Sequence, residues 1–559
     1  MTRPSLDLAR AVLSALIASG VRDVVYCPGS RSAPFAYALD AACRAGLVRA
    51  HVRLDERSAG FLALGLSRAG RPSGERGESG PRGPFEPLPV AVVTTSGGAV
   101  AELHAAVAEA RHSRLPLVVV SANRPAELQG VGASQTTEQA GIFASHVLSV
   151  LALPAGTAAD RSLAARIGRT LARARGLPTG IAGPVQIDVA LRDPLTPEGG
   201  SASSPDFALG EPPARAPATP VPRLAWEGVV EPGLRTVIVA GDGADPSVSA
   251  WAGAARLPIL AEPSSGLAFD PMRVPYQQSL LSGPLAERVE QVVVTGRPTL
   301  SRPVSALLAR AGVRIVVVDP TPEWPDAAGA ASLVVPALAA PAALAADEDW
   351  FAEWRVAAAD AGERIAKAVD AEPLSVLGVA RTLWREDSRA LVLGASNSVR
   401  AADLVGVGGS PRRVISNRGL AGIDGTIATA IGLALGSGEP VTALLGDLAF
   451  LHDAGALAIP AGEEHPDLVL VIADDAGGGI FAGLEHGLPE NAPTFERWFA
   501  TAQPTSIEGL AAAYGVDYRE VRSEAELAAL LVEESRGMRI VRVPCARPSA
   551  IRAVRNAAR

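Results

Sequence analysis

Two short apolar runs, each followed by an acidic residue, constrain the fold of this chain more than any other feature. The run at 441–445 is followed two residues later by Asp447, and the run at 468–473 is followed two residues later by Asp475. Both runs have the length of a strand, are bounded by turn residues and are separated by one helix-length segment, which predicts adjacent parallel strands. The two acids would then lie at the carboxyl edge of one sheet, where open α/β sheets bind ligands.

The oxygen atoms expected at this edge suit a divalent cation. Asp447 and Asp475 offer two carboxylates, and the glycine tract at 477–479 offers a flexible turn beside them. Such a set suits Mg²⁺, which keeps some of its water and takes further oxygens from the phosphates of a ligand. The alternative is two acidic turn residues that bind no metal. The triplet at 241–243 also follows an apolar run, but no second strand ends at the matching distance beyond it, so an ordinary turn is predicted there.

The length of 559 residues is too great for one hydrophobic core and predicts about three domains. Strand and helix patterns alternate along three stretches, with a helix near 99–111 as one example. This alternation predicts an α/β protein with three doubly wound parallel-sheet domains. The expected division is a first domain at 1–192, a Pro- and Ser-rich linker at 193–222, a smaller Rossmann-like domain at 223–345, a linker and helix at 346–374, and a third domain at 375–559.

The charge and the cysteine content exclude several classes of protein. A net charge of −8 provides no basic surface for nucleic acid, so arginines used singly on small anions are expected instead. The three cysteines are scattered and form neither a metal pair nor a disulfide framework, which fits a reducing compartment. Asp7 and Arg10 interrupt the apolar segment at 6–18, which predicts an amphipathic helix rather than a signal sequence, and no run has the length of a membrane span. We therefore expect a cytoplasmic protein, with a mobile surface loop at 70–84, acting on a small acidic molecule.

The spacing of Asp447 and Asp475 resembles the diphosphate-binding motif of thiamine-diphosphate enzymes, in which a Gly-Asp pair is followed at this distance by an Asn pair. Here the second pair is Asp474-Asp475, which adds one negative charge beside the phosphates. The resemblance implies that Asp447 and Asp475 bind Mg²⁺ by side chain and Gly477 binds it by its carbonyl, with Mn²⁺ as an alternative metal. It covers essentially the full length and implies pyrimidine-binding, central Rossmann-like and diphosphate-binding domains in that order.

The same resemblance selects one catalytic carboxylate. Glu56 lies between a short strand and an apolar helix. There the enzyme class has the acid that shares a proton with the aminopyrimidine of the cofactor and so activates the thiazolium carbon. A site of low dielectric constant would raise the pKa of this acid. The alternative is a first-turn glutamate that the helix dipole favours.

Two Gly-rich segments are expected to contact the cofactor. Thr94–Gly98 joins a strand to a helix, so its backbone amides can approach a ligand closely. In Ser416–Gly425, Ile423 is bulky enough to hold the two cofactor rings in a bent conformation, whereas an ordinary Gly-rich turn is the alternative. The further cofactor contacts implied are Thr95, Ser96, Gly97, Ser396, Gly422 and Ile480.

Five segments identify a narrower family, and they are 27–32, 122–125, 132–135, 416–419 and 477–481. In them the chain closely resembles the synthase of menaquinone biosynthesis that makes 2-succinyl-5-enolpyruvyl-6-hydroxy-3-cyclohexene-1-carboxylate. The resemblance implies a transferase, a carboligase in which 2-oxoglutarate loses CO₂ and the resulting succinyl carbanion equivalent adds to isochorismate. Two dicarboxylates need several fixed cations, and arginine binds a carboxylate through two parallel hydrogen bonds.

The family match assigns substrate contacts position by position. The isochorismate side is expected to comprise Ser30, Arg31, Arg124, Gln135 and, from the central domain, Arg302. Carboxylates near the thiazolium would bind Arg400 and Arg418, helped by Ser396. An apolar wall that excludes water would comprise Ile480, Phe481 and Leu484. Each arginine alone could instead form a solvated or interdomain salt bridge.

The assembly and two rival functions follow from the same comparison. Because Glu56 and the Asp447 edge lie in different domains, the resemblance implies that they meet across a subunit boundary. A homodimer is then the minimum, and a homotetramer is the common state of the family. The rivals are another thiamine-diphosphate enzyme, such as an acetohydroxyacid synthase or a 2-oxoacid decarboxylase, and a non-catalytic nucleotide-binding protein of the same fold.

Overall fold

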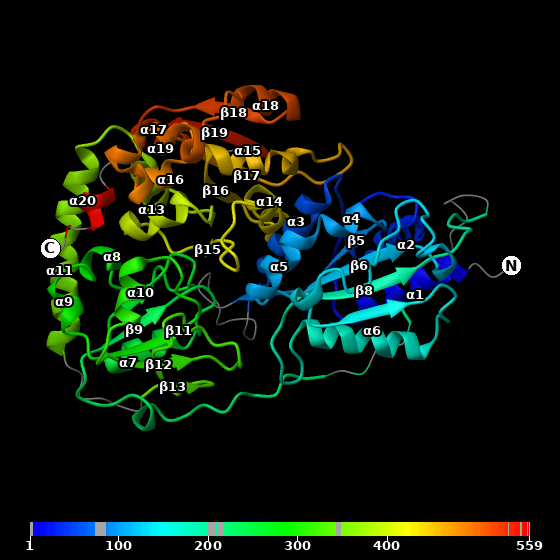
Figure 1. Ribbon diagram of the computed structural model, residues 1–559, viewed down its shortest axis with the longest axis horizontal. Coiled ribbons are helices and arrows are strands. Elements are labelled where there is room, and N and C mark those ends of the chain that lie inside the picture. Colours follow the sequence, from blue (N-terminus) through cyan, green and yellow to red (C-terminus); the bar gives the residue numbers. More distant parts are fainter. Residues whose placement is uncertain are drawn as a thin grey trace.

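The computed structural model of the chain describes residues 4–72, 85–198, 207–210, 214, 216–341, 348–534, 536–547, 551–555 and 557. Within these residues the strands form three larger sheets, all parallel, and one antiparallel pair, β3 (Arg71–Pro72) with β4 (Phe85–Glu86). Helices cover the sheets (Figure 1), so the predicted α/β class with three parallel sheets is confirmed. Most of the loop expected at 70–84, and parts of the linkers expected at 193–222 and 346–374, fall outside the described residues. The domain boundaries stay a prediction.

The first sheet has the strand order β2-β1-β5-β6-β8-β7. Its strands are β1 (Asp23–Tyr26), β2 (Arg49–Val52), β5 (Val90–Thr94), β6 (Leu117–Asn123), β7 (Val150–Leu153) and β8 (Val185–Ala190). The accompanying helices are α1 (Pro4–Ala18), α2 (Ala33–Arg44), α3 (Glu56–Ala69), α4 (Gly98–Ala101), α5 (His104–His112) and α6 (Arg161–Ala174). The single helix predicted at 99–111 is wrong, because the N–H of Leu103 donates to the carbonyl of Val100, three residues back, and this tighter turn separates α4 from α5.

The central sheet has the order β10-β9-β11-β12-β13. Its strands are β9 (Thr236–Ala240), β10 (Ile259–Ala261), β11 (Gln291–Thr295), β12 (Arg314–Val318) and β13 (Ala331–Val335). The helices of this region are α7 (Val248–Ala255), α8 (Gln277–Leu280), α9 (Pro284–Glu287), α10 (Arg302–Leu308) and the long α11 (Glu348–Asp370). The turn predicted at 241–243 does follow β9, and there Asp242 pairs with Arg297 at 3.5 Å.

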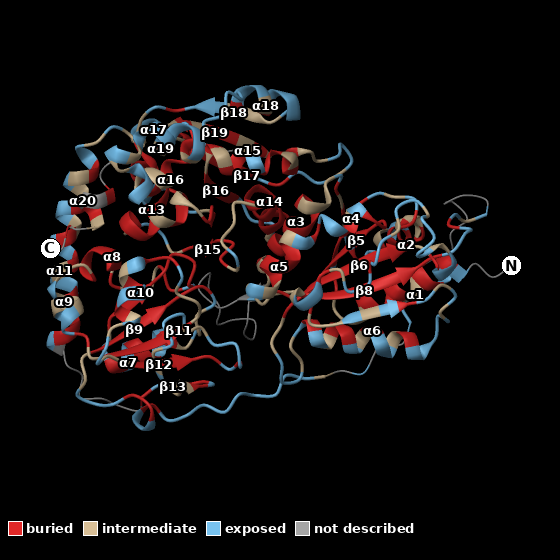
Figure 2. Cartoon of the chain, viewed as in Figure 1, coloured by how far each residue is buried: buried red, intermediate tan, exposed pale blue. Residues whose placement is uncertain are grey.

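The third sheet has the order β15-β14-β16-β17-β19-β18. Its strands are β14 (Ala390–Leu393), β15 (Val414–Ile415), β16 (Val441–Gly446), β17 (Leu468–Asp474), β18 (Asp517–Glu520) and β19 (Met538–Pro544). The helices are α12 (Val376–Glu386), α13 (Asn397–Val405), α14 (Thr426–Ser437), α15 (Asp447–His452), α16 (Gly479–Ala482), α17 (Ala492–Phe495), α18 (Ile507–Tyr514), α19 (Glu524–Leu531) and α20 (Ile551–Arg555). Figure 2 shows the inner strands of the three sheets buried, as expected for apolar runs covered by helices on both faces, whereas the edge strand β18 is partly exposed.

The first and third domains pack through α3 and α14, which lie side by side in Figure 1. A Cβ atom on Gly65 would lie 2.1 Å from the carbonyl oxygen of Thr429, and one on Gly432 would lie 2.1 Å from the carbonyl oxygen of Leu62. Only glycine at both positions allows the two helix backbones to approach this closely. This crossing fixes how the first sheet sits against the third.

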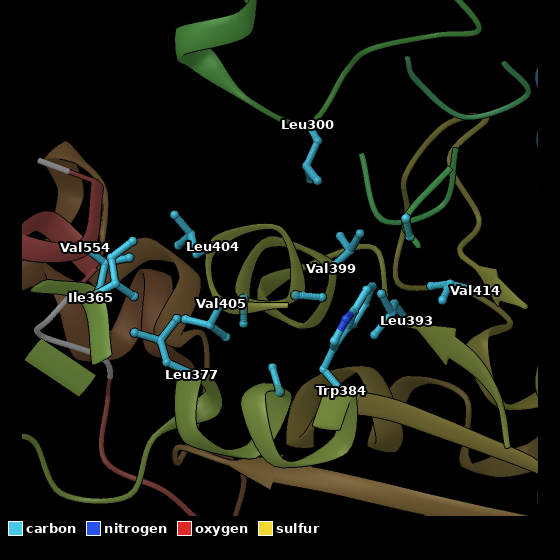
Figure 3. Close-up of a cluster of buried hydrophobic side chains, with 14 of the residues drawn as sticks. Leu300, Ile365, Leu377, Trp384, Leu393, Val399, Leu404, Val405, Val414 and Val554 are labelled. Carbon is cyan, nitrogen blue, oxygen red and sulfur yellow. The ribbon is translucent and has the colours of Figure 1, made fainter. Parts of the chain in front are cut away.

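The central and third domains share one buried cluster of apolar side chains. It includes Trp350 and Trp354 of α11, Trp384 of α12 and Val399 of α13. In Figure 3, Leu300 from the loop before α10 points toward α13. The third domain thus has a common core with each of its neighbours. Among the described residues, no helix combines the length and the apolar character needed to cross a membrane.

Candidate active site

The two acids of the predicted metal site lie at one edge of the third sheet. Asp447 directly follows β16 and Asp475 directly follows β17, and these strands pair with Gly446 opposite Ala473. Burial, followed by the neighbouring charge of Asp474, raises the pKa of Asp447 to about 6. Burial and then the charge of Asp447 raise the pKa of Asp475 to about 7. The two carboxylates therefore repel each other in a site of low dielectric constant, and a cation between them would relieve that repulsion.

The backbone after β17 is shaped around these carboxylates. Gly477 has a φ of +125°, which strongly favours glycine. A Cβ atom on Gly479 would lie 1.8 Å from the Oδ2 atom of Asp475. Among the residues that the structure describes, no three His, Cys, Asp or Glu side chains form a metal cage. Two acids and a backbone carbonyl therefore fit a Mg²⁺ whose other ligands are water and phosphate oxygens.

The two members of the Asp474-Asp475 pair have different surroundings. The Oδ2 atom of Asp474 accepts a 2.7 Å hydrogen bond from the Nε atom of Arg542 on β19. Arg542 also binds Glu520 at 2.7 Å, so the three side chains form a salt-bridged network across neighbouring strands. Asp474 thus forms a direct ion pair with Arg542, although its charge still helps to raise the pKa of Asp447, whereas Asp475 faces Asp447. Both acids therefore contribute negative charge near the expected diphosphate site.

Glu56 is the first residue of α3 and follows β2 through a short turn. Asp55 caps this helix, because its carboxylate accepts hydrogen bonds from the N–H of Ser58 at 3.3 Å and from the hydroxyl of Ser58 at 2.8 Å. Burial, followed by the charges of Asp55 and Glu102, raises the pKa of Glu56, as predicted for a proton-sharing acid. Asp55 therefore caps the helix through Ser58, while the carboxylate of Glu56 accepts a hydrogen bond from its own backbone N–H.

The segments after β1, β5 and β6 bring together most of the residues predicted on the isochorismate side. Arg31 is buried and donates to the carbonyl of Leu191 at 2.8 Å. Arg124 donates to the hydroxyl of Ser96 at 3.1 Å and to the side-chain carbonyl of Gln135 at 3.3 Å. Burial and the nearby charge of Arg31 lower the pKa of Arg124. Ser30 precedes Arg31 in the same turn and is exposed.

The glycine-rich turns of the first domain pack closely against one another at the carboxyl edge of the first sheet. A Cβ atom on Gly29 would lie 2.3 Å from the Cβ of Thr95, and one on Gly97 would lie 3.2 Å from the Cα of Gln135. The N–H of Gly97 donates to the side chain of Gln139 at 3.2 Å. Thr95, Ser96 and Gly97, predicted to contact the cofactor, are therefore in the same cluster as Arg124 and Gln135.

Three further arginines gather where the third domain meets the central one. Arg418 is buried and donates to the hydroxyl of Thr299 at 2.9 Å, while its Nε and Nη1 atoms have no hydrogen-bond partner. Arg400, on α13, donates to the carbonyl of Ser396 at 3.3 Å, and burial followed by the charge of Arg418 lowers its pKa. Arg302 donates to Glu485 at 2.7 Å. Arg302 therefore lies on the side of Arg400 and Arg418 within one chain, and not beside Arg31 and Arg124.

The predicted apolar wall belongs to a larger aromatic group. Ile480 and Phe481 lie in α16, and Leu484 follows it. The ring centroid of Phe481 lies 5.6 Å from that of Phe499, on which His486 stacks with centroids 4.5 Å apart. Phe499 and His486 were not predicted from the sequence; His486 lies two residues after Leu484 and was a usable signal, whereas Phe499 is brought in by the fold. Gly422 and Ile423 lie in the turn before α14, and Ile423 packs against the core shared with α3.

The structure thus contains two clusters of candidate residues rather than one. The hydrogen-bond and ion-pair partners of Arg31 and Arg124 all lie at or before residue 193. The acid pair and the remaining arginines belong to the third domain and its contact with the central one. In Figure 1, α4 lies on one side of the α3–α14 contact and α13 and α16 lie on the other. Each cluster holds part of the predicted site.

Comparison with known proteins agrees with this layout. Residues 6–142 match the family model described as the N-terminal TPP binding domain of thiamine pyrophosphate enzymes, and residues 395–543 match the C-terminal TPP binding domain. The chain is 44% identical to the 2-succinyl-5-enolpyruvyl-6-hydroxy-3-cyclohexene-1-carboxylate synthase of Kineococcus radiotolerans, over 97% of this chain and 96% of that protein. The proteins of the same name from Paenarthrobacter aurescens and Nocardia farcinica are each 42% identical, over 96% and 98% of this chain and 94% and 97% of their own.

The chain belongs to this synthase family. The predicted thiamine-diphosphate-dependent enzyme is thereby confirmed. The two matched models cover the two outer domains, each of which carries one of the clusters described above. The roles of the individual site residues stay predictions.

Proposed function

We propose that this chain is a Mg²⁺-dependent synthase that decarboxylates 2-oxoglutarate and joins the remaining succinyl unit to isochorismate, releasing CO₂ in the cytoplasmic pathway to menaquinone. The observation that carries the proposal is the presence of buried or half-buried arginines in both clusters of candidate residues. Arg31 and Arg124 lie on the first domain, and Arg400 and Arg418 lie on the third. Two dicarboxylate substrates need such fixed cations, whereas a 2-oxoacid decarboxylase acting on one monocarboxylate does not.

Each group of residues has one task in this proposal. When bound, the cofactor supplies the carbon nucleophile and accepts the electron pair left by CO₂. Asp447, Asp475 and the carbonyl of Gly477 would hold Mg²⁺ against its diphosphate, and the metal would neutralise the repulsion between the two acids. Glu56 would hold a proton at N1′ of the aminopyrimidine, a role that its raised pKa suits.

The substrate residues divide between the two edges. Arg400 and Arg418, with Ser396, would bind the carboxylates of 2-oxoglutarate. The unpartnered Nε and Nη1 atoms of Arg418 are available for this purpose. Arg31 and Arg124, with Ser30 and Gln135, would bind isochorismate, completed by Arg302 of a second copy. Ile480, Phe481 and Leu484 would exclude water from the reacting carbon.

The separation of the two clusters supports a site made by two copies of the chain. Glu56 and the acid pair would then meet only when the first domain of one copy faces the third domain of another. A homodimer is the minimum assembly under this proposal, and a homotetramer would contain two such dimers. A single copy would bind little cofactor productively and would not turn over.

A coupled assay tests the reaction. We expect the absorbance of isochorismate to fall only when 2-oxoglutarate, Mg²⁺ and thiamine diphosphate are all present. Pyruvate supplied in place of 2-oxoglutarate serves as the matched donor without the second carboxylate. Turnover of pyruvate at a comparable rate would support the rival 2-oxoacid enzyme and overturn the proposal.

Mixing two inactive variants tests the shared site. Glu56→Gln removes the first-domain acid, and Asp447→Ala removes the third-domain acid. If sites form between copies, a mixed dimer contains one site with both defects and one intact site. Equal mixing after dissociation should restore about a quarter of the wild-type activity, because about half of random pairs are mixed. No recovery, with mixed dimers demonstrated by mass spectrometry, would place each site within one chain.

A further inference from the structure

One loop of the central domain contacts the candidate site at several points. In the loop at 299–301, which leads into α10, the hydroxyl of Thr299 accepts the 2.9 Å hydrogen bond from Arg418. The side chain of Leu300 points toward α13, the helix of Arg400, and belongs to the same buried cluster as Val399 (Figure 3). We call this segment the 299–301 loop. The position of this loop sets the position of the Thr299 hydroxyl, which accepts the hydrogen bond from Arg418.

A buried acid, Glu262, holds this loop by a hydrogen bond to its backbone. Glu262 directly follows β10 and is only 2% exposed. Its Oε1 atom accepts a 2.7 Å hydrogen bond from the N–H of Leu300. Its own N–H donates to the carbonyl of Ala240, at the end of the neighbouring strand β9, at 2.9 Å. The carboxyl group therefore connects the edge of the central sheet to the middle of the 299–301 loop.

The chemical environment of Glu262 is unusual for a purely structural residue. Its Oε2 atom has no hydrogen-bond partner. Burial raises the pKa of Glu262 to about 8, and the hydrogen bond from Leu300 and the charge of Arg418 only partly oppose this shift. Burying a carboxyl group is costly, and an apolar residue could fill the same space at lower cost. The one use that the geometry gives this acid is to hold the N–H of Leu300.

We propose that Glu262 is a positioning residue for the donor substrate: by holding the 299–301 loop it places Thr299, which in turn aims Arg418 at a carboxylate of the 2-oxo diacid. The inference rests on the proposed function, because it assigns Arg418 to that carboxylate. Asp403 is a second buried acid here, and its charge acts on both Arg400 and Glu262. It lies three residues after Arg400 on α13 and accepts hydrogen bonds from Gln277 at 2.6 Å and Gln278 at 2.5 Å.

Two substitutions at Glu262 separate its hydrogen bond from its charge. Glu262→Ala leaves the N–H of Leu300 without a partner, and we expect the KM for 2-oxoglutarate to rise about tenfold while kcat stays within about twofold. Glu262→Gln keeps an oxygen acceptor without charge, so its KM should stay near that of the wild type at pH 7. A role in general stability would change kcat, the KM for isochorismate and cofactor affinity together. Glu290→Ala is the matched control, because this half-buried acid of the same domain also accepts a backbone N–H hydrogen bond, from Arg235.

Thr299→Val provides the second test and does not depend on the folding of the alanine variant. It removes the acceptor of Arg418 with little change of volume, so it should raise the same KM. If Glu262 acts through this hydroxyl, Glu262→Ala combined with Thr299→Val should cost little more than either change alone. Additive effects, or an unchanged KM in both single variants, would overturn the inference. A wild-type enzyme that does not consume 2-oxoglutarate would instead overturn the proposed function.

Discussion

The carboxyl edges of the first and third sheets are built from the same alternation of strands and helices, yet they differ in how their charges are balanced. At the first edge, Arg124 is already held by Ser96 and Gln135, and Arg31 by a backbone carbonyl. At the third edge, Asp447 and Asp475 repel each other, and Arg418 keeps unpartnered nitrogen atoms. The first edge is organised mainly by its own hydrogen bonds, although the Nε atom of Arg31 has no partner. Under the proposed function, the third would be completed by a cation and an anion from outside the chain.

The largest effect is expected from Glu56, the acid at the start of α3. Glu56→Gln keeps the shape of the side chain but cannot share a proton, so turnover should fall by about 10³-fold or more. Calorimetry should show cofactor affinity within a few-fold of the wild type, because the proposed diphosphate site lies at the other edge. Glu102→Gln, at an exposed neighbour, is the control. A normal rate in Glu56→Gln would remove this residue from the mechanism.

A substitution at the third edge should have the opposite effect, because it should weaken cofactor binding first. Asp447→Ala removes a proposed metal ligand, and we expect Mg²⁺-dependent binding of thiamine diphosphate to weaken by about 100-fold, as when one partner of a buried charge pair is lost. Titration calorimetry with and without Mg²⁺ measures this. Asp474→Asn is the matched control, because Asp474 is engaged by Arg542. An equal loss in both variants would mean that the pair acts through the fold and not through the metal.

A smaller effect, on the KM for one substrate at a time, is expected from arginine-to-lysine substitutions at the two edges. Lysine keeps the charge of arginine but not its planar pair of donors. Arg124→Lys should raise the KM for isochorismate about tenfold and leave that for 2-oxoglutarate nearly unchanged, and Arg418→Lys should do the reverse. Initial rates with each substrate varied in turn measure both constants. If both variants raised the same KM, the assignment of one substrate to each edge would be wrong.

The sequence was sufficient for the local features of both edges. Apolar strand runs, the acids that follow them and glycine-rich turns are short-range signals, and they placed Asp447 beside Asp475 and Glu56 at a helix start. The break between α4 and α5 was missed because the apolar pattern continues through Leu103, and the pattern cannot show which carbonyl an N–H selects.

Long-range relations were beyond the sequence pattern. Glu262 follows an apolar run just as Asp447 does, but its partner Leu300 is 38 residues away and the contact depends on how a loop folds back. The division of labour between Asp474 and Asp475 likewise depends on Arg542, which comes from a later strand. Arg302 was expected with Arg31, and only the packing of the domains reveals that Glu485 is its partner within one chain.

The last prediction concerns α14, the helix that packs against α3 between the two edges. Asp453 is fully buried, and its Oδ2 atom accepts hydrogen bonds from the N–H groups of Ile427 and Ala428 at 2.7 and 3.0 Å, at the start of α14. Burial raises its pKa to about 7 from 3.8, with the two N–H donors opposing the shift. The folded state therefore binds a proton more tightly than the unfolded state, so this contribution to stability is complete below pH 4 and is lost as the pH rises toward 7.

Asp453→Asn tests this sign, because asparagine keeps an oxygen acceptor and does not titrate. Relative to this variant, the wild type should lose up to about 1.4 kcal/mol per pH unit between pH 5 and 7, and no more above pH 8. Thermal unfolding of both proteins across this range measures the difference, and any fixed cost of the amide cancels from its pH dependence. A difference that stays constant between pH 5 and 8 would show that Asp453 is ionised throughout this range and holds α14 as a charged cap, and it would contradict the predicted loss of stability.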